Sequence, residues 1–225
     1  MQLCFFFVVV LSAMPLRGQT VEDLLTRAEL TDFAETTSYD EVMALSEGLA
    51  ELSENIHLTT FGYTNEGRAL PLLVIGAPDA SAAAVLRTGK TRVYVQGNIH
   101  GGEVCGKEAL LMMLRRYAMG VYPNWTDELV LLIAPIYNAD GNERVSLRNR
   151  PRQHGPIGGM GQRPNAQGLD LNRDHIKLDS PEARSLVRLM TEYDPHVAVD
   201  LHTTNGTRHA YHLTYSPPLH PNTST

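Results

Sequence analysis

The chain has 225 residues, of which 43% are hydrophobic and 20% are charged, which is the composition of an ordinary globular protein. Its formal net charge of −6 offers nothing that would attract nucleic acid or an anionic membrane surface, so we expect neither as a partner. The length suffices for one large domain or two small ones.

The first 19 residues predict an export signal. The apolar run Leu3–Leu11 has the length of a signal-peptide core and is too short to span a bilayer, so we expect no stable membrane span. The alternative is a buried strand that starts at Met1. We therefore divide the chain into a signal peptide over residues 1–19 and one domain over residues 20–225, exported to a periplasmic or extracellular location. Cys105 is then the single cysteine, which excludes an internal disulfide.

Helices open the predicted domain. Residues 21–52 have a helical pattern with a break before Ser38, and Ser38 with Glu41 predicts a capping box that begins the second helix. Residues 56–63 and 69–75 predict two strands, and the Asn and Gly between them are typical of a hairpin turn.

A strand, a helix and another strand follow a loop that holds one alanine-rich helical turn. Residues 91–96 predict a strand, 103–119 a helix, and 129–134 a fully apolar strand that is covered on both faces. This order indicates a crossover unit of an α/β sheet. Residues 138–174 have no apolar period and predict a long ordered loop, which in a compact domain is usually functional.

The last predicted elements are a helix that starts at Ser180-Pro181 and strands over 197–201 and 209–214. We therefore predict an α/β fold with a mixed, mostly parallel sheet flanked by helices on both faces.

Two side chains suited to zinc converge where the strand over 91–96 meets its helix. His100 and Glu103 are three residues apart, which turns both toward one side of the first helical turn. The glycines between them allow a tight turn. An imidazole and a carboxylate at this spacing make half of a zinc site. The same spacing also fits a histidine that caps the helix and a glutamate that complements its dipole.

A catalytic zinc site needs a third protein ligand and an open position. His202 is the best candidate because it follows a predicted core strand, at the edge where α/β sheets gather their sites. His196 precedes the same strand and belongs at the opposite edge. The remaining alternatives are His175, His209 and His212.

The run Gly168–Asp174 lies between these candidate ligands and contains alternating polar residues. Arg173 provides a cationic fork suited to a carboxylate. Taken alone, this run fits a solvated polar loop better than a binding site.

Several motifs in a fixed order resemble the zinc metallocarboxypeptidase family, the carboxypeptidase A/B-like group. The resemblance runs from about Tyr39 to His202 and includes an opening helix and hairpin. Its motifs are His100–Glu103, Asn138–Gly141, Gly168–Arg173 and Asp200–His202, with Tyr39–Met43 and Gly62–Arg68 before them.

The resemblance implies that His100, Glu103 and His202 bind one zinc ion (Zn²⁺) per chain. It implies that Asn172 and Arg173 hold the free C-terminal carboxylate of a substrate. Asp170 would accept a hydrogen bond from His100 and orient that ring.

The resemblance also implies a catalytic arginine that polarises the scissile carbonyl, binds the substrate there and stabilises its oxyanion. The candidates are Arg144, Arg148, Arg150 and Arg152. We favour Arg150, with Arg148 as the next choice.

The family's general-base glutamate and the tyrosine that closes over the substrate come well after the third zinc ligand. No glutamate follows Glu192 in this sequence. We therefore expect the base beyond Thr225 and regard residues 20–225 as a catalytic domain truncated at its C-terminus. Such a chain would bind zinc and a carboxylate but lack the base for efficient hydrolysis, and it would leave a sheet edge exposed.

The expected function is that of an exported zinc carboxypeptidase that removes a C-terminal residue from peptides or cell-wall peptides. One alternative is a zinc amidohydrolase that removes an acyl group from an N-acyl amino acid. Another is a non-catalytic carbohydrate- or peptide-binding remnant that has kept the pocket.

Overall fold

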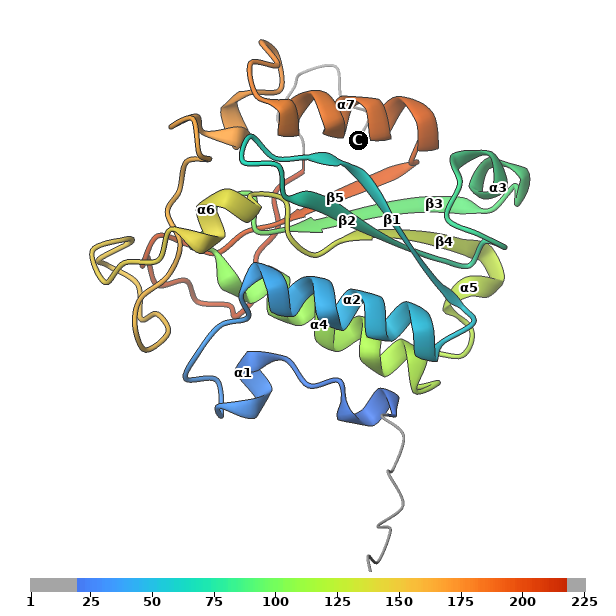
Figure 1. Cartoon of the computed structure of the whole chain (residues 1–225), viewed down its shortest axis with the longest axis horizontal. Coiled ribbons are helices and arrows are strands. Elements are labelled where there is room, and N and C mark those ends of the chain that lie inside the picture. The colour runs from blue at the N-terminus through green and yellow to red at the C-terminus, as the bar shows by residue number, and fades with distance from the viewer. Residues whose placement is uncertain (1–19, 218–225) are drawn as a thin grey trace, which may run out of the picture.

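A computed structural model describes residues 20–217, and the predicted signal peptide over residues 1–19 lies outside them. A five-stranded sheet forms the centre of the molecule, in the order β1-β2-β4-β3-β5 (Figure 1). Its strands are β1 (Ile56–Tyr63), β2 (Ala69–Ile75), β3 (Thr91–Gly97), β4 (Leu129–Ala134) and β5 (Val197–Leu201).

The pairing of these strands confirms a mixed sheet. β1 with β2 and β2 with β4 are antiparallel, whereas β3 pairs in parallel with β4 and with β5. Parallel and antiparallel pairings are therefore equally frequent among the described strands. The parallel part is the one that matters for function, because the carboxyl ends of β3, β4 and β5 lie at one edge of the sheet.

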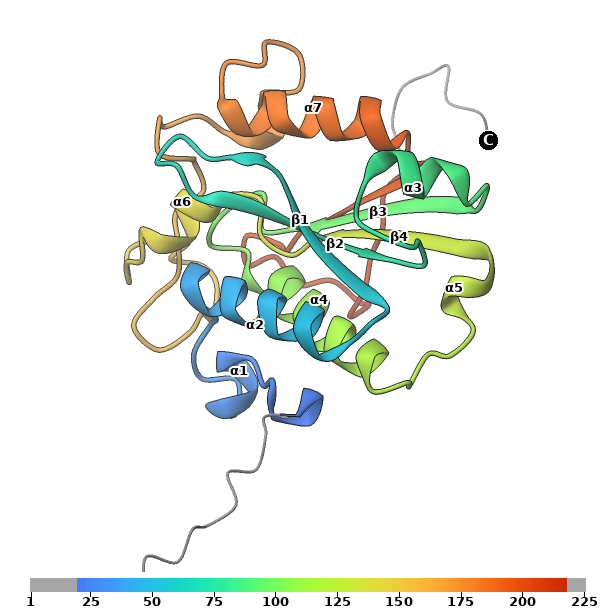
Figure 2. The same cartoon turned by 45° about the vertical axis from the view of Figure 1, so that its right-hand side comes forward.

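Helices cover both faces of the sheet, as expected. α7 (Pro181–Tyr193) lies over one face together with α3 (Ala82–Arg87), and α2 (Tyr39–Leu52) lies beside α4 (Val104–Ala118) on the other (Figures 1 and 2). The short α1 (Arg27–Leu30) lies outside α2 and α4 (Figure 1). The result is a three-layer α/β/α arrangement.

Alternation along the central strands divides the core between these two layers. Leu72 and Val74 belong to the cluster under α7, whereas Leu73 and Ile75 belong to the cluster under α2 and α4. Successive residues of a strand point to opposite faces. A strand covered on both faces therefore reads as the continuous apolar run seen in the sequence.

Two helix starts form through the capping residues that the sequence indicates. The Ser38 hydroxyl accepts from the Glu41 amide, and the Glu41 carboxylate accepts from the Ser38 amide at 2.8 Å. Ser180 caps α7 by accepting from the Ala183 amide, with Pro181 in the first turn. Each cap satisfies amides that have no partner inside the helix, and the one at Ser38 is reciprocal.

The loops contain short helices that the sequence does not indicate individually. These are η1 (Val21–Asp23), α5 (Trp125–Glu128), α6 (Ala139–Glu143) and η2 (Leu171–Arg173). The helical pattern expected from residue 21 onward is broken into η1 and α1, and Asp32 and Phe33 adopt positive φ angles that no helix continues through.

The strand expected over residues 209–214 is wrong, because this segment has no strand pairing. Tyr211 and Leu213 are 76% and 85% exposed, so their alternation has no buried face to pack against. Within residues 20–217, β5 has β3 as its single neighbour, which leaves its other edge open. None of the helices in this range is long and apolar enough to cross a membrane.

Candidate metal centre

Two neighbouring parallel strands deliver the histidines of the candidate metal centre. Gly97 of β3 pairs with Leu201 of β5, so His202 begins beside the turn that carries His100. The carboxyl ends of parallel strands meet at one edge of a sheet, as the sequence argument requires. His196 lies at the other end, where its Nδ1 accepts from the Arg92 amide at 3.0 Å.

The turn after β3 is tightly packed, which fixes the position of the two residues that project from it. Asn98 has a φ of 63° and is fully buried, and its side-chain amide donates to the Gly101 carbonyl at 3.0 Å. A Cβ on Gly101 would overlap the backbone of Gly141. The glycines between His100 and Glu103 are therefore required by the close approach of another backbone.

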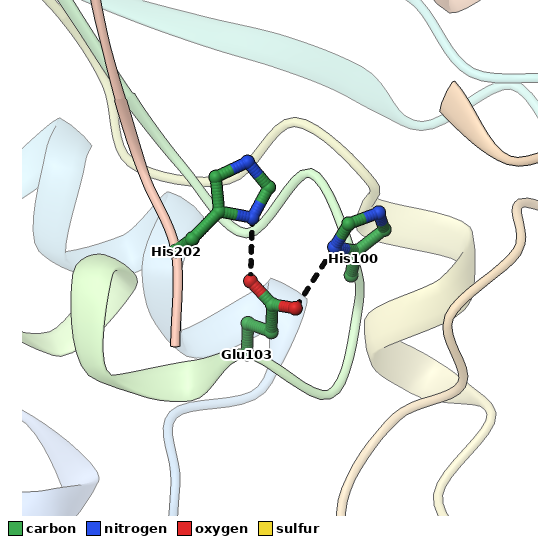
Figure 3. A group of neighbouring side chains, drawn as sticks. All are labelled: His100, Glu103 and His202. Carbon is green, nitrogen blue, oxygen red and sulfur yellow. Dashed lines mark hydrogen bonds and ion pairs between the residues drawn. The ribbon is translucent and has the colours of Figure 1, made fainter. Parts of the chain in front are cut away.

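His100, Glu103 and His202 converge so that one ligand atom from each lies within 4.8 Å of the others (Figure 3). His100 Nδ1 is 2.9 Å from Glu103 Oε1, and His202 Nδ1 is 2.8 Å from Glu103 Oε2. His100 and Glu103 are 2% exposed, whereas 35% of the His202 side chain is exposed. Within residues 20–217 this is the one group of histidine, cysteine and acidic residues arranged so that it can hold a metal ion.

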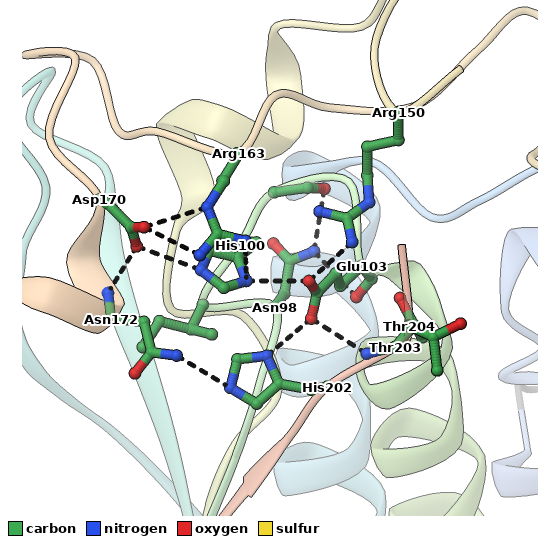
Figure 4. Close-up of polar contacts among 12 residues, drawn as sticks. Asn98, His100, Glu103, Arg150, Arg163, Asp170, Asn172, His202, Thr203 and Thr204 are labelled. Carbon is green, nitrogen blue, oxygen red and sulfur yellow. Dashed lines mark hydrogen bonds and ion pairs between the residues drawn. The ribbon is translucent and has the colours of Figure 1, made fainter. Parts of the chain in front are cut away.

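Each histidine contacts a second carboxylate through its other ring nitrogen. His100 Nε2 lies 3.1 Å from Asp170 Oδ1, and His202 Nε2 lies 2.8 Å from Asp200 Oδ2 (Figure 4 shows the first contact). A carboxylate on Nε2 keeps the proton of a neutral ring on Nε2, so Nδ1 is the nitrogen that a metal ion can take once it carries no proton. Two imidazole nitrogens and a carboxylate presented in this way fit zinc, which favours this set with a fourth position open to water.

Hydrogen bonding determines the charge of the metal-free centre. Burial opposes ionisation of Glu103, but bonds from His100, His202 and the Thr203 amide outweigh it and hold the pKa of Glu103 well below its usual range. Hydrogen bonds from His202 to Asp200, which has the larger effect, and to Glu103 raise the pKa of His202 to about 10. A metal ion and a proton therefore compete for His202.

His100, Glu103 and His202 together form the metal set. Of the four candidate arginines for stabilising an oxyanion, Arg150 contacts it. Its Nη2 donates to Glu103 Oε1 at 2.8 Å, and 9% of its side chain is exposed (Figure 4). Arg144 pairs instead with Glu66, and Arg148 is exposed. Arg152 lines a cavity beside the centre.

Asn172 and Arg173, which are predicted to hold a carboxylate, lie next to the metal set. Asn172 is half-buried, whereas Arg173 is exposed. Asn172 Nδ2 is 3.4 Å from His202 Nε2 (Figure 4). The Arg173 side chain is exposed, and its Nη1 donates to the Asn172 carbonyl at 2.8 Å. Both residues belong to η2, whose preceding residue Asp170 accepts from the Asn172 amide. η2 therefore links the contact that orients His100 to the candidate carboxylate site.

Sequence reasoning missed three residues at this centre. Asp200 lies in β5, two positions before His202, and residues two apart along a strand point to the same face, so the sequence does contain a signal for this contact. Arg163 donates from Nε and Nη2 to Asp170 Oδ2 at 3.0 and 2.9 Å, and its Nη1 lies 3.4 Å from His100 Nδ1. The Thr203 amide donates to Glu103 Oε2 at 3.0 Å. Only tertiary structure reveals the last two contacts.

The Arg163–Asp170 pair also explains the charge of the residue that orients His100. Burial opposes ionisation of Asp170, but hydrogen bonds from Arg163 and His100 lower the pKa of this carboxyl group. Asp170 is thus ionised at neutral pH and ready to accept the His100 Nε2–H.

Residues 42–218 match a family model described as zinc carboxypeptidase. Among curated proteins, a probable carboxypeptidase 2 of Arthroderma benhamiae is 31% identical over 143 residues, covering 62% of this chain and 24% of that protein. A carboxypeptidase E of Caenorhabditis elegans is 34% identical over 159 residues, covering 66% of this chain and 32% of that protein. The chain thus spans about a quarter to a third of these relatives.

Solved structures show the same fold. A carboxypeptidase A from Helicoverpa armigera superposes with a TM-score of 0.60 at 20% identity, over 76% of this chain and 47% of that one. A metallo-carboxypeptidase from Burkholderia cenocepacia gives 0.56 at 23% identity, over 75% and 41% of the two chains.

Proposed function

Because the chain belongs to the zinc carboxypeptidase family, we propose that it binds one zinc ion through His100, Glu103 and His202. We further propose that it serves hydrolysis of the C-terminal peptide bond of peptides, cell-wall peptides included. The observation that carries the proposal is the geometry of the two rings. Both present Nδ1 to Glu103 while Nε2 faces an aspartate.

A bound zinc ion would acidify a water molecule and polarise the scissile carbonyl. The protein's own contribution is orientation. Asp170 and Asp200 hold the two rings, and the Thr203 amide holds one oxygen of Glu103. The buried turn keeps His100 and Glu103 in place before any ligand arrives, so little rearrangement accompanies binding.

Arg150 is the proposed group that polarises the carbonyl and stabilises the oxyanion, because its guanidinium already contacts the metal set. Arg163 is a second candidate on the same geometric ground. Its Nη1 is 3.4 Å from His100 Nδ1, and its two hydrogen bonds to Asp170 Oδ2 hold it without any contribution from Glu103. Separate Arg150→Gln and Arg163→Gln variants assign the role, since the true group lowers kcat when it is removed.

Asn172 and Arg173 are proposed to bind the terminal carboxylate of the substrate. Asn172 contributes an amide donor beside His202, and the exposed Arg173 guanidinium offers a paired set of donors for a carboxylate. A substrate held there by its carboxylate presents its last peptide bond to the metal set.

The proposal includes weak hydrolysis by the 225-residue chain. Glu103 is itself a proposed ligand, and the two other carboxylates that contact its histidines, Asp170 and Asp200, are both engaged as hydrogen-bond acceptors. Within residues 20–217, then, none of the carboxylates in contact with these rings is free to act as the general base. We also propose export to a periplasmic or extracellular location, on the grounds of the N-terminal apolar run.

Zinc content tests the metal assignment. The purified chain should hold one equivalent of zinc, and His202→Ala should hold little. His175→Ala serves as the matched control, because His175 is exposed and lies outside the metal set. Equal zinc in wild type and His202→Ala would refute His202 as a ligand.

Peptide binding tests the substrate class. The zinc-loaded chain should bind a peptide with a free C-terminus more tightly than the same peptide with a C-terminal amide. Asn172→Ala with Arg173→Ala should remove that difference. An N-acyl amino acid that binds as well as the peptide would favour the amidohydrolase instead.

A further inference from the structure

A cavity of about 420 Å³ opens beside the metal centre. Its lining includes Gly102, directly before Glu103, and Thr203, directly after His202. It therefore adjoins both turns that carry the proposed ligands. In Figure 4, Thr203 and Thr204 lie on one side of the metal set and Asn172 lies on the other.

The charged side chains that line this cavity are basic. These are Arg152 and Arg208; the imidazole of His154 also lines the cavity, and no aspartate or glutamate does. The charge of the cavity lining is therefore positive, although the chain as a whole has a formal net charge of −6. The two arginines that contact the candidate metal ligands have carboxylate partners, Arg150 with Glu103 and Arg163 with Asp170. By contrast, the Arg152 and Arg208 guanidinium groups make no hydrogen bond or ion pair with any residue between 20 and 217.

Hydrogen bonds hold together the two loops that carry these arginines. The Gln153 side-chain amide donates to Thr203 Oγ1 at 3.4 Å and to the Thr204 carbonyl. Arg150 Nε in turn donates to Gln153 Oε1 at 2.6 Å. Gly206 has a φ of 99°, and a Cβ there would overlap the backbone of Arg152, so this approach needs glycine. Hydrogen bonds thus connect the wall of the cavity, through Gln153 and Arg150, to Glu103 of the metal set.

A bound peptide would have to pass this wall. This step rests on the proposed function, in which the terminal carboxylate lies at Asn172 and the scissile carbonyl lies at the metal. The rest of the peptide then leaves the centre on the opposite side, toward Thr203 and Thr204 (Figure 4). Its next side chains enter the cavity that holds Arg152 and Arg208.

We propose that this cavity binds an acidic side chain of the substrate, one or two residues before the scissile bond. A carboxylate there would meet two guanidinium groups that have no partner among residues 20–217, so charge-assisted hydrogen bonds could form without loss of any bond within that range. The site would select substrates by the residue on the N-terminal side of the cleaved bond.

Binding of labelled peptides to the zinc-loaded chain tests this proposal. The peptides carry an N-terminal fluorophore and a free C-terminus, and differ by Glu or Gln at one of the two positions before the scissile bond. A partly exposed ion pair is worth up to about 1 kcal/mol, so fluorescence anisotropy should show about fivefold tighter binding of the Glu peptide at one position. The double variant Arg152→Gln, Arg208→Gln should abolish this preference.

Arg116→Gln is the matched control. It removes one positive charge, where the double variant removes two, from an exposed position near the end of α4. The Arg116 guanidinium makes no hydrogen bond or ion pair with any residue between 20 and 217 and lines no part of the cavity. The Glu preference should survive in this variant.

Equal binding of Glu and Gln peptides at both positions would overturn the inference, as would a preference that persists in the double variant. The proposed function has a separate readout in the same assay. If an amidated C-terminus binds as well as a free one, the proposed function fails whatever the Glu preference shows. Absence of binding by every peptide would overturn both.

Discussion

The two halves of the candidate metal centre differ in how firmly the fold holds them. His100 and Glu103 project from a buried turn between β3 and α4, and both are 2% exposed. His202 follows β5, an edge strand whose residues are mostly exposed, and 35% of its side chain is exposed. One half is part of the core, whereas the other is attached to the rest of residues 20–217 through the pairing of β5 with β3 and through contacts with Glu103 and Asn172.

This difference indicates what a metal ion would do for the structure. The buried half is arranged by packing and hydrogen bonds of its own, so it is formed before metal arrives. The exposed half is the one that gains order from binding. A metal ion that bridges the two would therefore tie β5 to the core and stabilise the folded state in proportion to its affinity.

The largest expected effect comes from Glu103→Gln, because Glu103 joins the two halves. Its carboxylate contacts both histidines, Arg150 and the Thr203 amide. Removing the charge leaves Arg150, with 9% of its side chain exposed, without its carboxylate. Loss of one partner from such a pair costs about 3 kcal/mol of unfolding free energy. Denaturant unfolding of the metal-free protein measures this.

Zinc titration of the same variant should show at least about a 100-fold loss of affinity, because one charged ligand is gone. Glu47→Gln on the exposed face of α2 is the control and should leave both quantities unchanged. Wild-type zinc affinity in Glu103→Gln would contradict its role as a ligand.

His100→Ala and His202→Ala compare the two halves directly. Both should abolish stoichiometric zinc binding. The metal-free stabilities should differ, because truncation at the buried His100 leaves a cavity and removes a contact of Asp170. We expect a loss of about 2 kcal/mol for His100→Ala and a smaller loss for His202→Ala, both measured above pH 10, where the protonated His202 no longer contributes to stability. Equal losses would mean that the exposed half is as firmly held as the buried one.

The same division explains which parts of the molecule the sequence could predict. The ranges of β1, β2 and α7 follow from apolar period, turn residues and caps, because those signals are local. His100 and Glu103 were recognisable for the same reason, since three residues on one helical turn must face one way.

Contacts between distant segments left no such signal. Arg163 reaches Asp170 and His100 from a loop without apolar period, and the sequence did not distinguish it from other arginines. The expected strand over 209–214 failed because alternation produces a strand only where another strand or a core is present to receive it. The position of β5 in the sheet likewise depends on which strands pair beside it, so residues 197–201 alone could not predict it.

Asp170→Asn and Asp200→Asn test the aspartates behind the two rings. Each keeps its shape but loses the charge that fixes the Nε2–H tautomer. Zinc affinity should fall about 10- to 100-fold in each variant, as is usual for groups that orient a ligating histidine. The larger fall should follow Asp200→Asn, because His202 lacks the packing that holds His100 in place. A larger fall for Asp170→Asn would reverse the ranking of the two halves.

The buried half should also give the stability of the protein a pH dependence. Lys107 lies one helical turn after Glu103, is fully buried, and donates from Nζ to Asn142 Oδ1 at 2.8 Å and to the Thr37 carbonyl. Burial lowers its pKa from 10.5 to about 8, against the opposing effect of Glu108 and other nearby acids. Between these two values the unfolded chain binds more protons than the folded one.

The contribution of Lys107 to stability should therefore rise as the pH increases from about 8 to 10.5, by at most about 1.4 kcal/mol per pH unit. In the metal-free protein His202 acts in the opposite direction. Its pKa is raised from 6.5 to about 10, so its contribution is complete below pH 6.5 and is lost as the pH rises through about 10. Comparing Lys107→Met with wild type cancels the His202 effect, and Lys177→Met at an exposed position controls for net charge. Urea unfolding with a chelator present, at intervals between pH 7 and 10, measures all three proteins. If the difference between Lys107→Met and wild type does not change over this range, Lys107 is not held by burial at the lowered pKa, and the core beneath the metal turn is more hydrated than its packing indicates.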